Sequence, residues 1–251
     1  MDRVPNCFIE EVLLLLDYER YGCSGDAEVK RLPSIWGQIV NSKRPKEYAR
    51  LDVYLRNDKE AFFLVWNRGK FLKLPNLEQF TISQMFIWDG HEGVSDGSVY
   101  HPLKETNFKL LRRQLARGHA FTMCLESKGS HALVDRLRLV PPRIVELKVF
   151  NLLPSSVEAL TRSVDRGTLR SLESFGCLTV THEHLQVLLN FVASEQLEHF
   201  SFKISVRSPV SYSAVLTEVV NAFLSRNRAH RFKFIVDAGA MTLPPNDFTA
   251  T

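Results

Sequence analysis

The chain has 251 residues, of which 45% are hydrophobic and 24% are charged, a balance typical of globular proteins that excludes disorder of the whole chain. The formal net charge of +4 is too small to require a nucleic-acid partner. The apolar run at 12–16 is much shorter than the ~20 residues of a membrane helix. No targeting segment is recognisable, so we expect a cytoplasmic or nuclear protein with no membrane partner.

A short helical segment is predicted within residues 1–45. Pro5 suits the first turn of a helix, and Phe8, Val12 and Leu16 follow it at intervals of four residues. Such an amphipathic helix can cap the first unit of a repeat protein by covering its apolar end. The residues alone therefore favour a capping role.

The next segment is predicted to be rich in strands. Leu51, Val53 and Leu55 alternate with other residues, as in a half-buried strand. The dense apolar run at 61–66 is typical of a strand buried on both faces. Residues 67–70 contain Asn and Gly and read as the turn after it.

A helix is predicted over 103–116, with Phe108, Leu111 and Leu115 as its buried stripe. The adjacent face is basic and is formed by Lys109, Arg112, Arg113 and Arg117. This cluster is either an ordinary solvated helix face or a phosphate-binding surface. A degenerate strand at 119–127 and a short helix at 132–139 follow.

Three segments repeat the L-x-x-L-x-L spacing of a leucine-rich repeat. Their first positions are Leu147, Leu172 and Leu197, which are separated by 172 − 147 = 25 and 197 − 172 = 25 residues. This interval falls within the ~20–29 residues of such repeats. An earlier copy begins at Leu77. The inward positions 4 and 6 are occupied by Phe80 and Ile82, Phe150 and Leu152, Phe175 and Cys177, and Phe200 and Phe202.

Helices are predicted between these strands. Ser155 and Glu158 form a possible capping box after Pro154, and Thr181 precedes an amphipathic stripe ending at Val192. A further helix is expected at 213–225, a last strand at 232–236 and a frayed tail at 242–251. The predicted fold class is α/β, an irregular leucine-rich-repeat-like solenoid over 46–241, and the alternative is an ordinary domain of several βα units.

A solenoid of this kind presents one strip of strand residues to a partner. Positions 3, 5 and 7 are expected to point outward, on a concave face that suits a protein ligand. These positions are Gln79, Thr81, Ser83, Val149, Asn151, Leu153, Ser174, Gly176, Leu178, His199, Ser201 and Lys203. The predicted partner-binding residues are Asn151, Gly176, His199, Ser201 and Lys203.

No catalytic, cofactor-binding or metal-binding motif is recognised. His182 and His184 are two residues apart on a predicted helix and therefore point in different directions, so they cannot share a metal ion. The four cysteines are scattered, and Cys124 and Cys177 fall at apolar strand positions, which predicts buried free thiols. We expect no enzyme activity and no cofactor.

The N-terminal elements resemble the shortened F-box of nematode F-box-like proteins. The resemblance rests on Val4-Pro5, the Phe8 to Val12 helix and Trp36-Gly37. It implies a substrate adaptor that docks on the Skp-type subunit of a cullin ubiquitin ligase, while the repeat domain binds a target protein. The docking residues implied are Val4, Pro5, Phe8, Val12 and Leu16.

Three functions are therefore weighed. The first is a non-enzymatic protein-recognition module that acts as a ubiquitin-ligase adaptor. The second is a plain repeat scaffold with no link to a ligase. The third and weakest is a basic nucleic-acid-binding module.

Overall fold

The structure is a computed structural model that describes residues 47–57, 59–90, 100–127, 129, 131–225 and 233–238. The predicted helical segment at 1–45 and the tail at 242–251 lie outside the described residues, and so do the docking positions Val4, Pro5, Phe8, Val12 and Leu16. The described part is a mixed α/β fold, which confirms the α/β part of the predicted class, while the solenoid stays a prediction. None of its helices combines the length and the apolar character that crossing a membrane requires.

The described residues form two compact units. The first comprises those up to 124 together with 131–145, and the second comprises those within 125–129 and from 146 onward. The predicted domain of residues 46–241 thus contains two units, and each is described by itself below.

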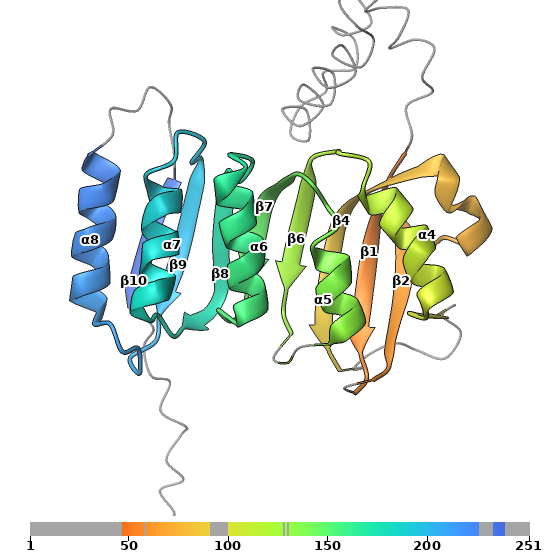
Figure 1. Cartoon of the computed structure of the whole chain (residues 1–251), viewed down its shortest axis with the longest axis horizontal. Helices are drawn as coiled ribbons and strands as arrows, with labels where there is room; N and C mark the ends of the chain where they lie inside the picture. Colours follow the sequence, from red (N-terminus) through yellow and green to blue (C-terminus); the bar gives the residue numbers. More distant parts are fainter. Residues whose placement is uncertain are drawn as a thin grey trace, which may run out of the picture. The chain divides into compact units, whose positions relative to one another are not determined.

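The first unit is a mixed sheet with two helices on one face (Figure 1). Its strands are ordered β6-β4-β1-β2-β3, with β5 paired to β2; β1 is parallel to β4 and antiparallel to β2. The elements are β1 (Glu47–Leu55), β2 (Ala61–Asn67), β3 (Lys70–Phe71), the 3₁₀ helix η1 (Leu74–Gln79), β4 (Phe80–Asp89), β5 (His101–Pro102), α4 (Glu105–Leu115), β6 (Phe121–Leu125) and α5 (Ala132–Arg138).

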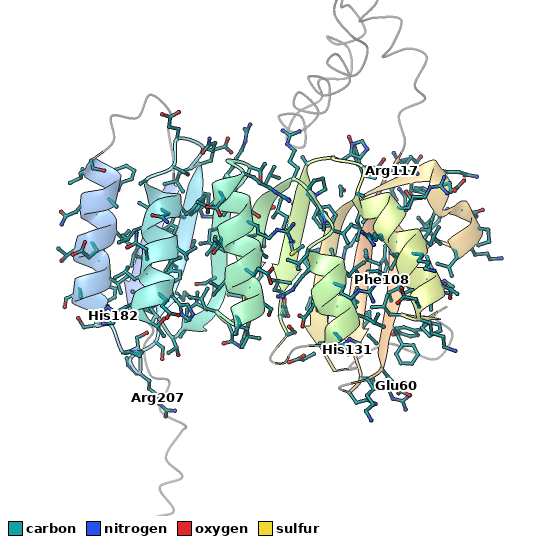
Figure 2. The ribbon with its side chains drawn as sticks, in the orientation of Figure 1. Glu60, Phe108, Arg117, His131, His182 and Arg207 are labelled. Carbon is teal, nitrogen blue, oxygen red and sulfur yellow. The ribbon has the colours of Figure 1, made fainter. Side chains whose placement is uncertain are left out.

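The core of this unit follows from the alternation along β1. Leu51 and Val53 are fully buried, as predicted, and they lie beside the equally buried Met85 and Ile87 of β4. Phe108 on α4 is also buried (Figure 2). Because side chains alternate along a strand, the other residues of β1 point to the opposite face of the sheet.

The predicted turn after β2 is confirmed. Arg68 and Gly69 both have positive φ, at 47° and 78°. This is the backbone of the two-residue hairpin turn whose twist matches the flanking strands. Asn67 fixes the turn to β1 by donating its side-chain amide to the Tyr48 carbonyl oxygen at 2.8 Å.

The second unit alternates strands and helices. Its strands run parallel in the order β10-β9-β8-β7, and α6, α7 and α8 cover one face (Figure 1). The elements are β7 (Ile144–Val149), α6 (Pro154–Asp165), β8 (Ser171–Leu178), α7 (His182–Val192), β9 (His199–Ile204), α8 (Tyr212–Leu224) and β10 (Lys233–Ala238). β10 is the strand predicted at 232–236, displaced toward the C-terminus.

The predicted helix caps have mixed outcomes. Thr181 caps α7 as expected, because its hydroxyl oxygen accepts the backbone N–H of His184 at 3.3 Å. The predicted capping box of Ser155 and Glu158 is wrong. Instead, the N-cap is Leu153, whose backbone N–H donates to the hydroxyl oxygen of Ser156 at 3.1 Å, and α6 starts at Pro154, two residues earlier than a cap at Ser155 would place it.

The equal 25-residue spacing does not give an equal strand register. Leu147 is paired with Leu172, 25 residues on, but Leu172 is paired with Phe200, 28 residues on. The register between β8 and β9 shifts between Glu173 and Cys177. The three strands are therefore not related by one constant repeat.

Several predicted inward positions are wrong. Phe150 lies beyond the end of β7 and is 38% exposed, while Phe175 is 45% exposed and Cys177 is exposed as well. The cause is that position 1 already lies within the strand and points inward. Side chains alternate from Leu172, so Ser174 and Leu178 are also inward while Phe175 and Cys177 point outward. Ser174 is buried there, and its hydroxyl oxygen accepts the backbone N–H of Lys203 at 2.9 Å. In β7 the alternation from Leu147 likewise places Val149 inward.

Five residues that were predicted to point outward are buried instead. β7 uses its Glu146, Lys148 side as the outer face, and in β4 Ser83 is the extra residue of a bulge opposite β1. The buried residues are Thr81, Ser83, Val149, Ser174 and Leu178. The β9 copy follows the prediction: Leu197, Phe200 and Phe202 are buried, while His199, Ser201 and Lys203 point to the other face.

Gly176 fills a structural role at the irregular part of β8. A Cβ atom built there would lie 2.7 Å from the carbonyl oxygen of Phe150, closer than side chains tolerate. We expect Gly176→Ala to lower the free energy of unfolding by about 1–3 kcal/mol, because the backbone must shift. Urea denaturation measures this, with Gly129→Ala as the control because a Cβ there meets nothing within 4 Å. Equal stability of the two variants would contradict the close approach.

Candidate functional site

The sheet face opposite α4 and α5 in the first unit carries aromatic and charged side chains. The strand register places Arg50 between Trp66 and Gln84, and Asp52 between Leu64 and Phe86. We call this surface the aromatic face. Its residues are Tyr48, Arg50, Asp52, Tyr54, Phe62, Trp66, Gln84, Phe86 and Trp88.

Arg50 is held in place on this face. Its Nε donates to Oδ1 of Asp52 at 2.7 Å, and its guanidinium carbon lies 4.1 Å from the ring centroid of Phe86. The Asp52 side chain is 2% exposed, whereas that of Arg50 is 40% exposed. Within the part of the chain that the structure describes, the two terminal amino groups of Arg50 have no partner, so one edge of the guanidinium remains available.

Burial outweighs the favourable contacts of the Asp52 carboxyl, so its pKa lies above the ordinary value. Burial raises its pKa, while the hydrogen bond and charge of Arg50 and the nearby indole N–H groups of Trp88 and Trp66 oppose that rise. Neither indole nitrogen makes a hydrogen bond of good geometry within the described residues, although both are buried. Arg50 is therefore the main partner that stabilises the ionised form.

Tyr54 extends the same face. Burial and the neighbouring charge of Asp52 raise its pKa to about 12, so the phenol stays protonated at neutral pH. Its ring meets Tyr100 edge to face at a centroid distance of 5.9 Å. A neutral hydroxyl beside the Arg50–Asp52 pair adds a polar contact that carries no charge.

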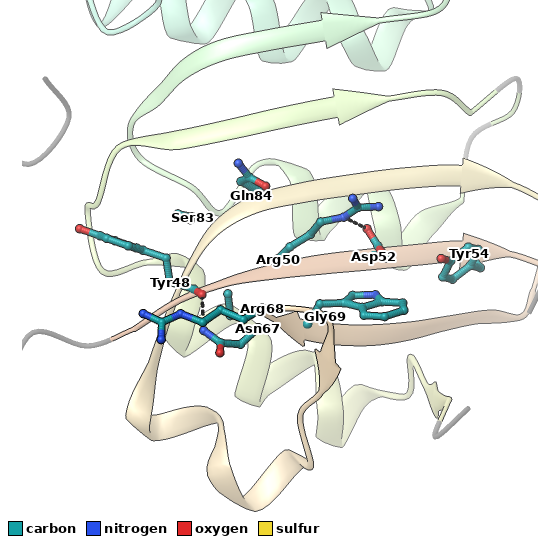
Figure 3. A pocket seen from close by; sticks show the side chains of 11 residues that line it. Tyr48, Arg50, Asp52, Tyr54, Asn67, Arg68, Gly69, Ser83 and Gln84 are labelled. Atoms are coloured by element: carbon teal, nitrogen blue, oxygen red, sulfur yellow. Dashed lines mark hydrogen bonds and ion pairs between the residues drawn. The ribbon is translucent and has the colours of Figure 1, made fainter. Parts of the chain in front are cut away.

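An open cavity of about 520 Å³ lies on the aromatic face (Figure 3). Tyr48 and Arg68 stand near one end of it, Tyr54 at the other, and the Arg50–Asp52 pair lies between them. Its lining is Tyr48, Ala49, Arg50, Asp52, Tyr54, Trp66, Asn67, Arg68, Gly69, Ser83 and Gln84. Two arginines and one aspartate give this lining a net charge of +1.

These residues were not predicted from the sequence. The alternation of Leu51, Val53 and Leu55 indicates the core side of β1, whereas the residues of the aromatic face occupy the intervening positions. The signal was present, because Arg50 and Asp52 are charged residues enclosed by buried ones. What joins them to Trp66 and Phe86 is the strand register, which spacing in the sequence does not give.

The predicted partner-binding residues lie in the second unit and are not equivalent. His199, Ser201 and Lys203 are on β9 and point away from the helices. Gly176 is in the irregular part of β8, and Asn151 follows the end of β7. The structure thus brings three of the five together on one strand, and their binding role stays a prediction.

The outer face of the second unit carries charges that compensate one another. Lys148 Nζ lies 3.2 Å from Glu146 and 3.1 Å from Glu173. Burial would lower the pKa of Lys148, but its contacts with the two carboxylates outweigh that effect and raise it. The charge of Lys148 is thus compensated by two carboxylates, whereas the two terminal amino groups of Arg50 make no hydrogen bond within the described residues.

The basic cluster on α4 is partly engaged within the protein. Arg113 forms an ion pair with Glu78 at 3.2 Å, and Arg117, just after α4 (Figure 2), donates to the Phe80 carbonyl oxygen at 3.3 Å. Lys109 and Arg112 are exposed. Half of the predicted phosphate-binding cluster therefore has other contacts.

His182 begins α7 (Figure 2), and no group of three His, Cys, Asp or Glu residues within the described ranges is placed to hold a metal ion. Cys124 is buried as predicted, but Cys177 is exposed. Comparison with protein-family models, with curated proteins and with solved structures found no match for this chain.

Proposed function

We propose that this chain is a non-enzymatic protein-recognition module whose partner contacts the aromatic face. The observation that carries the proposal is the open cavity lined by Trp66, Tyr48, Tyr54 and the half-exposed Arg50. Trp, Tyr and Arg are the residue types enriched among those that dominate binding energy at protein interfaces. Their convergence on one sheet face supports recognition of a protein.

The shape of the cavity favours a polypeptide over a small molecule. Its walls are strand side chains and the turn at Arg68 and Gly69, and no residue of α4 or α5 contributes to it. A typical small-molecule pocket buries most of its ligand. An extended segment, in contrast, can place one or two side chains in the cavity and continue along the strands.

The proposal is tested with short linear peptides displayed on phage and selected on the full chain. Changing Tyr48 and Arg68 together to Ala removes two exposed side chains at the cavity end without touching the core. We expect the selected peptides to bind this double variant about tenfold more weakly, since loss of a central interface contact costs ~1–2 kcal/mol. The readout is a dissociation constant from fluorescence polarisation.

The matched control changes Lys109 and Arg112, on the exposed surface of α4, to Ala. This variant removes positive charge away from the aromatic face, and peptide affinity should stay the same. If no peptide can be selected on the parent chain, or if both double variants bind equally well, recognition through the aromatic face is refuted.

The ligase link is the second part of the proposal. It rests on the F-box-like residues of the first 40 positions, with the domain that follows holding a target protein. We expect the purified full-length chain to bind a Skp-type adaptor and a variant with Phe8 and Val12 changed to Asp to lose that binding, because charged side chains would disrupt an apolar docking surface. A pull-down measures both. A folded parent that fails to bind would leave a plain interaction scaffold.

A further inference from the structure

We infer that the aromatic face binds an acidic side chain of its protein partner, with the terminal amino groups of Arg50 receiving the carboxylate. This inference rests on the proposed function, because it names the chemistry of the segment that enters the cavity.

The geometry of Arg50 suits a carboxylate. Only the Nε of Arg50 bonds to Asp52. Within the described residues, the edge formed by its two terminal amino groups makes no hydrogen bond. Guanidinium edges bind carboxylates through two parallel hydrogen bonds, which requires a planar acceptor with two oxygens. A partner's Asp or Glu side chain has that shape.

Arg50 is preorganised for binding. The Asp52 contact at 2.7 Å and the Phe86 ring centroid at 4.1 Å restrain the guanidinium from two directions. A side chain that is already ordered loses little conformational freedom when it binds, so more of the interaction appears as affinity. Asp52 is therefore a positioning residue that acts through Arg50.

The charge of the cavity lining favours an anionic group. Asp52 is buried and paired, and the remaining charged group of the lining, Arg68, lies at the end of the cavity, where it is 3.8 Å from Glu47. The net charge of +1 on the lining attracts an anion. Trp66 and Tyr48 beside it supply flat surfaces for the aliphatic or aromatic neighbours of the acidic residue.

Arg50 differs from Arg136 and Arg56 of the same unit in its hydrogen bonds and in its position at the cavity. Arg136 also stacks on a ring, that of Phe108 at 4.4 Å, but both of its terminal amino groups already bond to Glu105. Arg56, at the end of β1, is exposed and pairs only loosely with Glu60 at 3.7 Å. Neither lines the cavity, so Arg50 is the position that the structure assigns to an incoming carboxylate.

The test uses peptides selected on the full chain from an unbiased phage-displayed library. We expect Asp or Glu to recur at one position, and exchange of that residue for Asn or Gln in the synthetic peptide should weaken binding by about tenfold. Arg50→Lys keeps the positive charge but loses the planar edge of the guanidinium. It should weaken binding of the acidic peptide by a similar factor. Arg56→Lys is the matched control and should bind as the parent does.

The outcomes separate the two proposals. Peptides that bind the aromatic face, as shown by loss of binding in the Tyr48 and Arg68 double variant, but that carry no common acidic residue would overturn this inference and leave the proposed function intact. An acid-to-amide exchange in the peptide that leaves affinity unchanged would overturn it too, and this readout does not depend on the folding of any variant. Failure to select any peptide overturns both.

Discussion

Replacing Phe200 with Ala is expected to lower the free energy of unfolding by about 3–5 kcal/mol, a large share of the ~5–15 kcal/mol typical of a folded protein. Phe200 on β9 is 0% exposed, and its ring lies 5.6 Å from that of Phe202 and 6.2 Å from that of Phe191 on α7. Truncation leaves a cavity between strand and helix that the neighbours fill only in part. Urea denaturation followed by circular dichroism gives the value.

Phe175→Ala is the matched control. In the 25-residue repeat, Phe175 and Phe200 occupy the same position and would be equally costly to remove. In the structure Phe175 is 45% exposed, and the Lys148 ammonium lies 5.8 Å from its ring centroid. We expect its removal to cost about 0.5 kcal/mol. Equal losses from both variants would contradict the observed alternation of β8.

The second large effect is expected from Arg50→Met. This change keeps the length of the side chain but leaves the carboxylate of Asp52 buried without its ion-pair partner. Breaking a fully buried pair costs ~3–5 kcal/mol, and the partial exposure of Arg50 reduces this, so we expect a loss of about 2 kcal/mol at neutral pH. A second change, Asp52→Asn, should restore part of the loss by removing the buried charge.

The stability deficit of Arg50→Met is expected to change with pH in a definite direction. A carboxyl whose pKa is higher in the folded than in the unfolded chain takes up a proton more readily when folded, so its ionisation costs stability as pH rises through the folded pKa. Burial already raises the pKa of Asp52 above the ordinary 3.8, and loss of Arg50 raises it further. The deficit of Arg50→Met should therefore shrink as pH falls toward 3.8.

Chemical denaturation of the parent, the two single variants and the double variant at neutral and mildly acidic pH measures this dependence. The double variant, which has no carboxyl at position 52, should show no such relief relative to Asp52→Asn. A deficit of Arg50→Met that grows on acidification would contradict the buried-carboxylate account.

The fold was predictable where local pattern decides it. The helix stripe beginning at Phe108, the alternation of Leu51 and Val53, and the cap at Thr181 each follow from spacing along the chain. The α/β class follows from the succession of such elements. These features depend on contacts between residues close in sequence or on simple two- and four-residue periods.

The failures occur where one strand departs from that regularity. The 25-residue interval assumed a constant register, but the register of β8 against β9 shifts between Glu173 and Cys177, where Gly176 closely approaches Phe150 and Ser174 contacts Lys203 of β9. Both contacts join residues more than 20 positions apart. The aromatic face was missed for the same reason, since Arg50, Trp66 and Phe86 become neighbours only through strand pairing.

The central claim is that a protein segment binds the aromatic face, and the most direct measurement is a titration followed by the tryptophan indole N–H signals in a ¹H–¹⁵N NMR spectrum. A peptide selected on the full chain is added to the labelled protein. We predict that the indole signals of Trp66 and Trp88 shift progressively, while the backbone amides of Ser201 and Lys203 on β9 keep their positions. Shifts confined to β9, with both indole signals unmoved, would contradict the account.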